Sequence, residues 1–234
     1  MIPGAPCEGV GSPLRSPHES AQEAAGFVLA GGASSRMGED KALLLLAGRP
    51  LVQHAVCLLR ETGLQVSIAG AGSRALAEFA PIIDDRKPGL GPLAGICAAL
   101  DVTAARYAVF LPIDLPLLAP SLITYLIHRA RVSGQAVNLI TMNGFTQTFP
   151  AVLERTARPF LERELEAGRA GCFSAFQAAA AAMGQTISRT AVEYLAQSGQ
   201  IAHPRALPPF LWFLNLNHRA DLAEAEALFT QTIG

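Results

Sequence analysis

The chain has 234 residues, of which 50% are hydrophobic and 16% are charged. This apolar content is enough to build a core, so a globally disordered chain is excluded. Lysine and arginine together number 18, against 19 aspartates and glutamates, for a net charge of −1. This balance predicts neither nucleic acid nor an anionic membrane surface as a partner.

The first 24 residues are rich in proline and glycine and have no apolar run of the kind found in signal peptides. We expect residues 1–24 to form a disordered extension, followed by a single domain over residues 25–234. The four cysteines show neither a CxxC pair nor zinc-ligand spacing. A disulfide framework is therefore not expected, and a reducing cytoplasm is the simplest location.

Short apolar segments alternate with helical segments through the first half of the domain. Strands that are apolar throughout are covered on both faces, which predicts the α/β class, with a mainly parallel sheet and helices on both faces. In chain order the predicted elements are a strand over 25–30, a helix over 50–62, a strand over 65–69, a short helix over 73–80, a strand over 81–83, a helix over 93–101, a strand over 107–111 and a helix over 119–132.

The second half begins with a hairpin signal. Asn143-Gly144 is a two-residue turn sequence between the apolar segments 136–142 and 145–152, so we expect a late antiparallel hairpin to join the sheet. The remaining pattern predicts helices over 154–167, 178–182 and 218–229, and a late strand over 209–215.

A glycine-rich segment, LAGGASSRMGEDK at 29–41, follows the first predicted strand. In α/β sheets ligands bind at the carboxyl ends of strands. Gly31 and Gly32 allow backbone N–H groups to approach a phosphate closely, and Arg36 and Lys41 add two positive charges. The segment therefore suggests a phosphate site, and the alternative is an ordinary glycine turn with two solvated cations.

Two further segments place carboxylates after predicted strands. Asp114, in FLPIDLP, could bind Mg²⁺ together with substrate phosphates, or could be a polar residue of a proline turn. Asp84 and Asp85 precede PGLGPLAG, where Gly91 permits a tight wrap onto a helix start. Either aspartate could accept hydrogen bonds from a ribose or a base, or could belong to a charged surface turn.

The segment Asn215-Leu216-Asn217 precedes the last predicted helix. Asn217 is a plausible N-cap of that helix, and a polar contact to a second substrate or a metal is the alternative. Neither a Ser-His-Asp order nor a nucleophile elbow occurs in the chain, so acyl transfer has no support.

Five segments, in this order along the chain, resemble the molybdenum cofactor guanylyltransferase family over about residues 26–229. The resemblance implies a Rossmann-like nucleotidyltransferase fold, Mg²⁺ as cofactor and GTP as substrate. It also implies transfer of GMP to the terminal phosphate of molybdenum-molybdopterin, with release of pyrophosphate, by Mg-assisted in-line attack at the α-phosphorus. The segments are LAGGASSRMGEDK (29–41), GRPLVQH (48–54), PGLGPLAGI (88–96), FLPIDLP (110–116) and LNLN (214–217).

The resemblance assigns roles by position. It implies that Arg36, Lys41 and Asp114 are catalytic and that Asp114 holds Mg²⁺. It places Asp85 on the guanosine side, with Asp84 as a competing position. The other implied nucleotide-binding residues are Leu29, Ala30, Gly31, Gly32, Lys41, Asp114 and Gly91, and the acceptor-binding residues are Arg169, Asn215 and Asn217.

Two alternatives remain open. A related nucleotidyltransferase could use another base or acceptor, as in cytidylyl transfer to molybdopterin. A non-catalytic protein could instead bind GTP or molybdopterin and pass it on, and the thin set of basic residues around Arg169 motivates this possibility. Beyond GTP and molybdenum-molybdopterin, the implied partners are molybdopterin-carrying and molybdoenzyme-maturation proteins.

Overall fold

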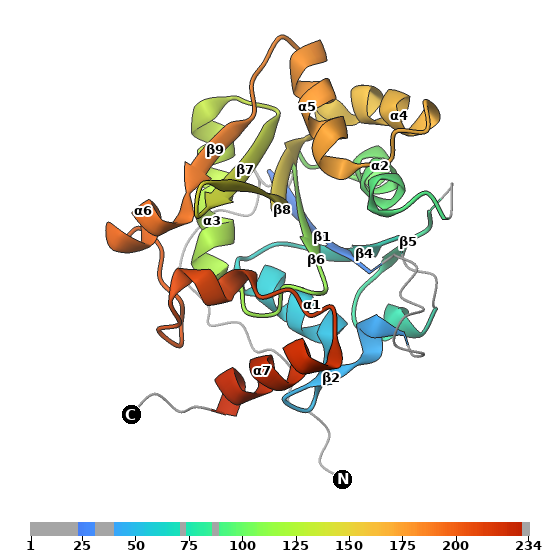
Figure 1. Cartoon of the computed structure of the whole chain (residues 1–234). Helices are drawn as coiled ribbons and strands as arrows, with labels where there is room; N and C mark the ends of the chain where they lie inside the picture. The colour runs from blue at the N-terminus through green and yellow to red at the C-terminus, as the bar shows by residue number, and fades with distance from the viewer. Residues whose placement is uncertain (1–22, 31–39, 71–73, 86–88, 231–234) are drawn as a thin grey trace, which may run out of the picture.

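The computed structural model describes residues 23–30, 40–70, 74–85 and 89–230. A seven-stranded sheet forms the centre of this part of the chain, with helices on both faces (Figure 1). The strands of the sheet are β1 (Ala24–Leu29), β4 (Val66–Ala69), β5 (Ile82–Ile83), β6 (Tyr107–Pro112), β7 (Val137–Met142), β8 (Phe145–Glu154) and β9 (Ser188–Ala191), and β2 (Leu45–Leu46) pairs separately with β3 (Arg49–Pro50).

Seven α-helices and four 3₁₀ helices are present in the described residues. The α-helices are α1 (Leu51–Glu61), α2 (Pro92–Val102), α3 (Pro120–Ser133), α4 (Arg158–Glu166), α5 (Cys172–Ala182), α6 (Val192–Gln197) and α7 (Arg219–Thr230). The 3₁₀ helices are η2 (Lys41–Leu43), η3 (Arg74–Glu78), η4 (Arg155–Ala157) and η5 (Pro209–Phe213).

The strand order is β5-β4-β1-β6-β8-β7-β9. The first four strands of this order are mutually parallel, β8 pairs antiparallel with β6 and β7, and β9 pairs parallel with β7. The predicted mainly parallel sheet and its antiparallel hairpin are therefore confirmed. Because β5, β4, β1 and β6 run in one direction, their carboxyl ends share one edge of the sheet.

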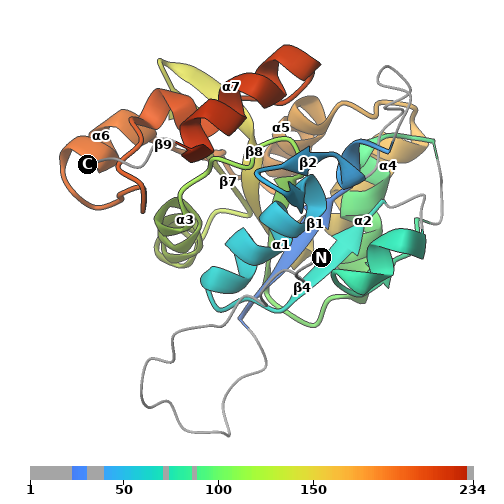
Figure 2. The same ribbon diagram turned by 90° about the horizontal axis from the view of Figure 1, so that it is seen from below.

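Two hydrophobic cores lie on opposite faces of the sheet. Val28 packs on the face covered by α1, α3 and α7, and its neighbour Phe27 packs on the face covered by α2, α4 and α5. Figure 2 shows α1 and α7 together on the first of these faces. Successive strand residues point to opposite faces, so a strand covered on both faces must be apolar at every position.

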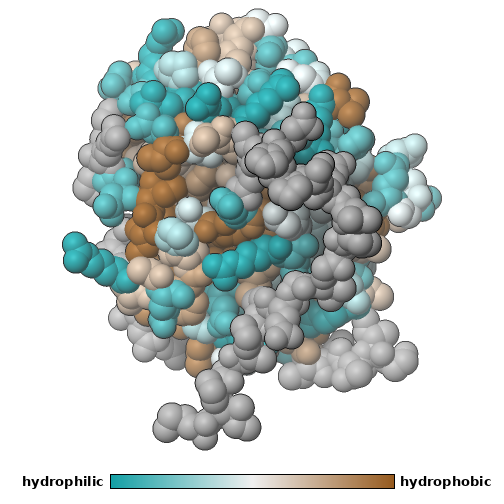
Figure 3. Space-filling model, turned by 180° about the vertical axis from the view of Figure 1, so that it is seen from behind, coloured by the Kyte–Doolittle hydropathy of each residue, from teal (hydrophilic) through white to brown (hydrophobic). Residues whose placement is uncertain are grey.

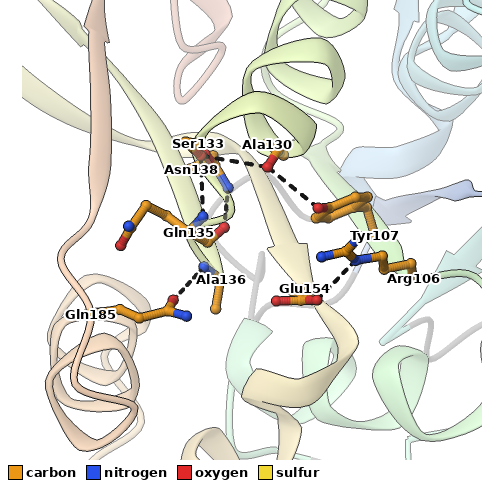
Figure 4. Close-up of polar contacts among 9 residues, drawn as sticks. All are labelled: Arg106, Tyr107, Ala130, Ser133, Gln135, Ala136, Asn138, Glu154 and Gln185. Carbon is orange, nitrogen blue, oxygen red and sulfur yellow. Dashed lines mark hydrogen bonds and ion pairs between the residues drawn. The ribbon is translucent and has the colours of Figure 1, made fainter.

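A buried polar network supports the start of β7 (Figure 4). The side chain of Asn138 is fully buried, and its Oδ1 accepts from the Ser133 hydroxyl at 2.9 Å. The Asn138 amide donates to the carbonyl of Gln135 at 2.7 Å, and the Ala136 N–H donates to Gln185 at 2.7 Å. The network satisfies a polar group that would otherwise be costly to bury.

Several predicted elements differ from the structure. The segment 209–215 is not a strand, because Pro208 and Pro209 cannot donate to a sheet, and a 3₁₀ helix buries Trp212 there instead. The predicted helix over 73–80 is a 3₁₀ helix. β1 includes Ala24, which had been assigned to the extension. Other differences are the undetected η2, β2, β3, β9 and α6, the division of 154–167 into η4 and α4, and a longer α5.

The surface seen from behind carries brown hydrophobic patches separated by teal hydrophilic side chains (Figure 3). Among the described residues, no helix has both the length and the apolar character needed to span a membrane. Cys57 is disulfide-bonded, whereas Cys97 and Cys172 form no disulfide. The chain therefore contains a disulfide bond at Cys57, which the cysteine spacing did not indicate.

Candidate active site

Three polar side chains from distant parts of the chain meet at one point. Lys41 Nζ lies 3.5 Å from Asp114 Oδ2 and donates to Asn217 Oδ1 at 3.3 Å. The side chains of Lys41 and Asp114 are only 14% and 25% exposed, respectively. The structure thus brings together one predicted cation, the predicted metal-binding carboxylate and one residue of the LNLN segment.

The backbone explains why Asp114 lies here. β6 pairs with β1 so that Pro112 is opposite Leu29, and the N–H of Ile113 donates to the Leu29 carbonyl at 3.3 Å. Asp114 therefore follows the sheet at the carboxyl edge, immediately beyond the end of β1. The N–H of Leu216 donates to the Asp114 carbonyl at 3.0 Å, which attaches the LNLN segment to the same place.

Lys41 is positioned by a local turn. The carboxylate of Asp40 accepts from the N–H of Ala42 at 3.1 Å and caps the short helix η2. Ala42 is buried, which anchors this helix to the core. Lys41 therefore extends from a fixed backbone toward Asp114.

Asp114 leaves one oxygen available for a ligand. Its Oδ1 is buried and has no hydrogen-bond partner within the described part of the chain. Leaving a buried acceptor unsatisfied costs about 1–3 kcal/mol, more for a charged group. A divalent cation would satisfy this oxygen, so the residues fit a bound metal ion.

The donor set matches Mg²⁺ shared with a substrate. The described residues include no group of three or more His, Cys, Asp or Glu side chains that could enclose a metal. Mg²⁺ is commonly bound by one or two carboxylates plus substrate phosphates rather than by a cage of protein ligands. A single carboxylate next to Lys41 has this character.

The other predicted nucleotide positions lie along the same edge or outside the described residues. β1 ends at Leu29, and the N–H of the next residue, Ala30, donates to the carbonyl of Ala69 at the end of β4 at 3.2 Å. Gly91 precedes α2 with φ of 76°, a conformation that favours glycine. Gly31, Gly32 and Arg36 lie outside the residues that the structure describes.

The two competing aspartates follow β5, two strands from β1. Asp84 is exposed, whereas Asp85 is half-buried and lines a cavity of about 60 Å³ with Arg158 and Asp101. Asp85 is thus the more enclosed of the pair. Both lie at the carboxyl edge of the parallel strands, as the sequence motif requires.

Of the predicted acceptor-binding residues, Asn217 contacts Lys41, whereas the side chain of Arg169 contacts Glu164. Arg169 donates two hydrogen bonds to Glu164, at 2.6 and 2.7 Å, between α4 and α5. The guanidinium of Arg169 is therefore engaged by a carboxylate. Asn215 is exposed, and its carbonyl accepts from the Asn217 N–H at 3.1 Å.

Sequence reasoning missed Asp221. Its Oδ2 accepts from the N–H groups of Asn217 and His218, both at 2.7 Å. Of the two roles considered for Asn217, an N-cap and a polar contact to a substrate or metal, the structure does not show the first, because its Oδ1 accepts from Lys41 and Asp221 accepts the N–H groups just before α7. An acidic residue in the first turn of a predicted helix was the available signal.

Comparison with known proteins settles the family. The model of the MobA-like NTP transferase domain matches residues 26–186. The chain belongs to this family. The resemblance drawn from the motifs is therefore confirmed, and the segment 187–234, which contains Asn217, lies beyond the part matched by the MobA-like model.

Individual relatives agree. A Bacillus cereus protein named probable molybdenum cofactor guanylyltransferase is 28% identical over 86% of this chain and 95% of its own length. A Xanthomonas euvesicatoria protein named molybdenum cofactor guanylyltransferase is 46% identical over 42% of this chain, and the chain spans 50% of that relative's length. The crystal structure of an Archaeoglobus fulgidus molybdopterin-guanine dinucleotide biosynthesis protein A superposes with a TM-score of 0.69 at 23% identity, over 88% of this chain and 98% of that one.

Proposed function

We propose that this chain transfers GMP from GTP to the terminal phosphate of molybdenum-molybdopterin and releases pyrophosphate. Membership of the MobA-like NTP transferase family supports this, as do the names of relatives such as that of Bacillus cereus. The observation that carries the proposal is the contact between Lys41 and Asp114 at the carboxyl edge of the sheet. This edge is where α/β folds bind their ligands.

The proposed reaction is an in-line displacement. An oxygen of the acceptor phosphate forms a bond to the α-phosphorus of GTP, and the bond from that phosphorus to the β-phosphate oxygen breaks. The nucleophile is already an anion, so the protein needs no strong general base. Its task is to bring two polyanions together and to offset the charge that develops on pyrophosphate.

Each residue has a proposed role in this task. Lys41 neutralises phosphate charge, and Arg36, the second cation of the glycine-rich segment, is proposed to do the same. Asp114 would hold Mg²⁺, which supplies positive charge to the phosphates when bound. Asn217 keeps Lys41 directed into the site, and its amide can also bond the acceptor. The proposed nucleotide contacts are Leu29, Ala30, Gly31, Gly32, Gly91 and one of Asp84 and Asp85, and the proposed acceptor contacts are Arg169, Asn215 and Asn217.

The test is a defined reaction mixture. The chain is incubated with GTP, Mg²⁺ and molybdopterin bound to a carrier protein, and the pterin is analysed by mass for an added GMP. Lys41→Met should abolish most of the product, because it removes a phosphate-binding cation. Arg189→Met is the matched control, since Arg189 is an exposed cation on β9 at the far end of the sheet and should leave turnover unchanged.

The same mixture decides the alternatives. If pyrophosphate is released much faster from CTP than from GTP, the reaction is cytidylyl transfer rather than guanylyl transfer. Tight GTP binding without pyrophosphate release, in the presence of the acceptor, would support a non-catalytic binding protein. We further propose that the chain works in the cytoplasm with molybdopterin-carrying and molybdoenzyme-maturation proteins, a proposal motivated by its membership of the MobA-like NTP transferase family.

A further inference from the structure

The turn 215–218 joins the candidate active site through two different contacts. Leu216 is buried, and its N–H bonds to the carbonyl of Asp114, so this residue fixes where the turn lies. Asn217 is exposed, and only its side chain reaches Lys41, at 3.3 Å. Burial of Leu216 does not set the direction of the Asn217 side chain, so another group must hold it.

That group is Asp221. A single oxygen of its carboxylate accepts the N–H groups of Asn217 and His218, both at 2.7 Å. Hydrogen bonds from backbone N–H groups to a carboxylate are charge-assisted and short. These two bonds, from His218 first and then Asn217, lower the pKa of Asp221, and the nearby charge of Lys41 lowers it further. The carboxylate therefore stays ionised and holds the backbone of the turn.

We propose that Asp221 is a positioning residue of the candidate active site, which keeps Asn217 against Lys41 by fixing the turn before α7. This inference rests on the proposed function. The ammonium group of Lys41 is shared between Asp114 at 3.5 Å and Asn217 at 3.3 Å. When Asn217 is misplaced, Lys41 moves onto Asp114 and competes with a metal ion for the carboxylate. Asp221 itself points to backbone N–H groups and has no role in contacting phosphate.

The competing explanation is that Asp221 only caps α7. A matched control separates the two. Glu193 lies in the first turn of α6, and its carboxylate accepts the backbone N–H of Asn143 in the hairpin turn. Both carboxylates accept backbone N–H groups, two from the turn before α7 for Asp221 and one from the hairpin turn for Glu193, but only Asp221 is connected to Lys41 through Asn217. A purely structural role predicts that removal of either carboxylate lowers stability and leaves kcat unchanged.

The first experiment is a double-mutant cycle of pyrophosphate release. Substitution of residues that orient the ligands of a metal site typically lowers activity by roughly 10–100-fold. We expect a loss of kcat in this range for Asp221→Ala. Asn217→Ala should show a similar loss, and the double variant should be no worse than Asn217→Ala alone, because both act through one contact. Asp221→Asn, which retains an acceptor oxygen, should recover most of kcat. Glu193→Ala should leave kcat unchanged.

The second experiment does not depend on turnover. Lys41 is one of two lysines in the chain, the other being Lys87, so its rate of acylation by an amine-reactive reagent can be followed by peptide mass analysis. Asp221→Ala and Asn217→Ala should change the rate at Lys41 by the same factor, and their double variant should show no additional change. Glu193→Ala should leave this rate at the wild-type value.

The outcomes are distinguishable. A wild-type chain that forms no product, together with coupled labelling of Lys41, overturns the proposed function and leaves the positioning role supported. An active wild type in which the effects of Asp221→Ala and Asn217→Ala simply add overturns the positioning role. Labelling of Lys41 that does not respond to Asp221→Ala overturns it as well.

Discussion

Replacing Asp114 by alanine should separate activity from stability. Loss of a metal-anchoring contact removes several kcal/mol of transition-state stabilisation, and about 1.4 kcal/mol corresponds to a factor of ten in rate. We therefore expect kcat to fall at least about a hundredfold, which corresponds to roughly 2.7 kcal/mol. Pyrophosphate release at saturating GTP and Mg²⁺ measures this loss.

The free energy of unfolding should hardly change. The contact between Asp114 Oδ2 and Lys41 is long, at 3.5 Å, and Lys41 keeps its bond to Asn217 in the variant. Loss of such a pair costs about 1 kcal/mol or less. The same substitution removes the buried Oδ1, which has no partner in the described residues and costs the folded chain about 1–3 kcal/mol. The two effects oppose each other.

Thermal unfolding provides the second measurement. A change of 1 kcal/mol moves the midpoint by roughly 2–4 °C in a chain of this size, so we expect a shift within about this range. Glu154→Ala is the control, because it removes a shorter ion pair, at 2.9 Å to Arg106, away from the site, and it should retain kcat. Near-normal turnover of Asp114→Ala would refute the metal assignment, and a collapse of its melting temperature would show that Asp114 is structural.

Three predictions concern stability. Burial, with smaller effects of arginines in the same cavity, lowers the pKa of His54 and of His203. Both side chains therefore stay neutral in the folded chain at a pH where the unfolded chain already takes up a proton. Their contribution to stability is complete above pH about 6.5 and is lost as the pH falls toward their folded pKa values. Urea unfolding from pH about 8 to 5 should show this fall, and His54→Gln should reduce its slope; an unchanged slope would contradict the assignment. Asn138→Leu should lower the free energy of urea unfolding by about 1–3 kcal/mol, because its partners lose their bonds, whereas an unaffected midpoint would show that the network is not needed. Gly95→Val should lower the free energy of unfolding by about 1–3 kcal/mol through overpacking, because a Cβ added at Gly95 would lie 3.2 Å from the Gly70 nitrogen. A variant as stable as wild type would show that α2 can shift to make room.

The parallel half of the fold could be predicted because its strands must be apolar at every position. Phe27 and Val28 face different cores, so neither can be polar, and the segment stands out from its surroundings. The hairpin was predictable for another reason. Asn143 and Gly144 have φ values of 50° and 78°, and few residues other than asparagine and glycine adopt such angles readily.

The undetected elements lack these local signals. In β9 only Ser188 is buried, so neither alternation nor an apolar run marks this edge strand. Its position depends on pairing with β7, about 50 residues earlier in the chain. The segment around Trp212 has the opposite character, because it is apolar enough for a strand while its prolines prevent one.

The candidate site could be predicted as a set of residues but not as an arrangement. Lys41 and Asp114 each carried a chemical hypothesis of their own, and the parallel order of β1 and β6 made their proximity a reasonable expectation. The contact of Lys41 with Asn217 joins positions 176 residues apart, and no local pattern encodes it. Asp221 was missed because its partners are backbone N–H groups, which are present at every residue except proline.

The site combines a fixed backbone with loosely paired side chains. Hydrogen bonds from the N–H of Ile113 to the Leu29 carbonyl and from the N–H of Leu216 to the Asp114 carbonyl hold the main chain at the sheet edge. The side chains, in contrast, are incompletely paired. Asp114 Oδ1 lacks a hydrogen-bond partner among the described residues, and Lys41 Nζ lies 3.5 Å from Asp114 Oδ2, a long distance for an ion pair. An arrangement of this kind orients charge in advance without neutralising it, which is the condition for electrostatic stabilisation of phosphoryl transfer. The small stability contribution expected of Asp114 and its large expected effect on turnover are thus two consequences of the same unfilled oxygen.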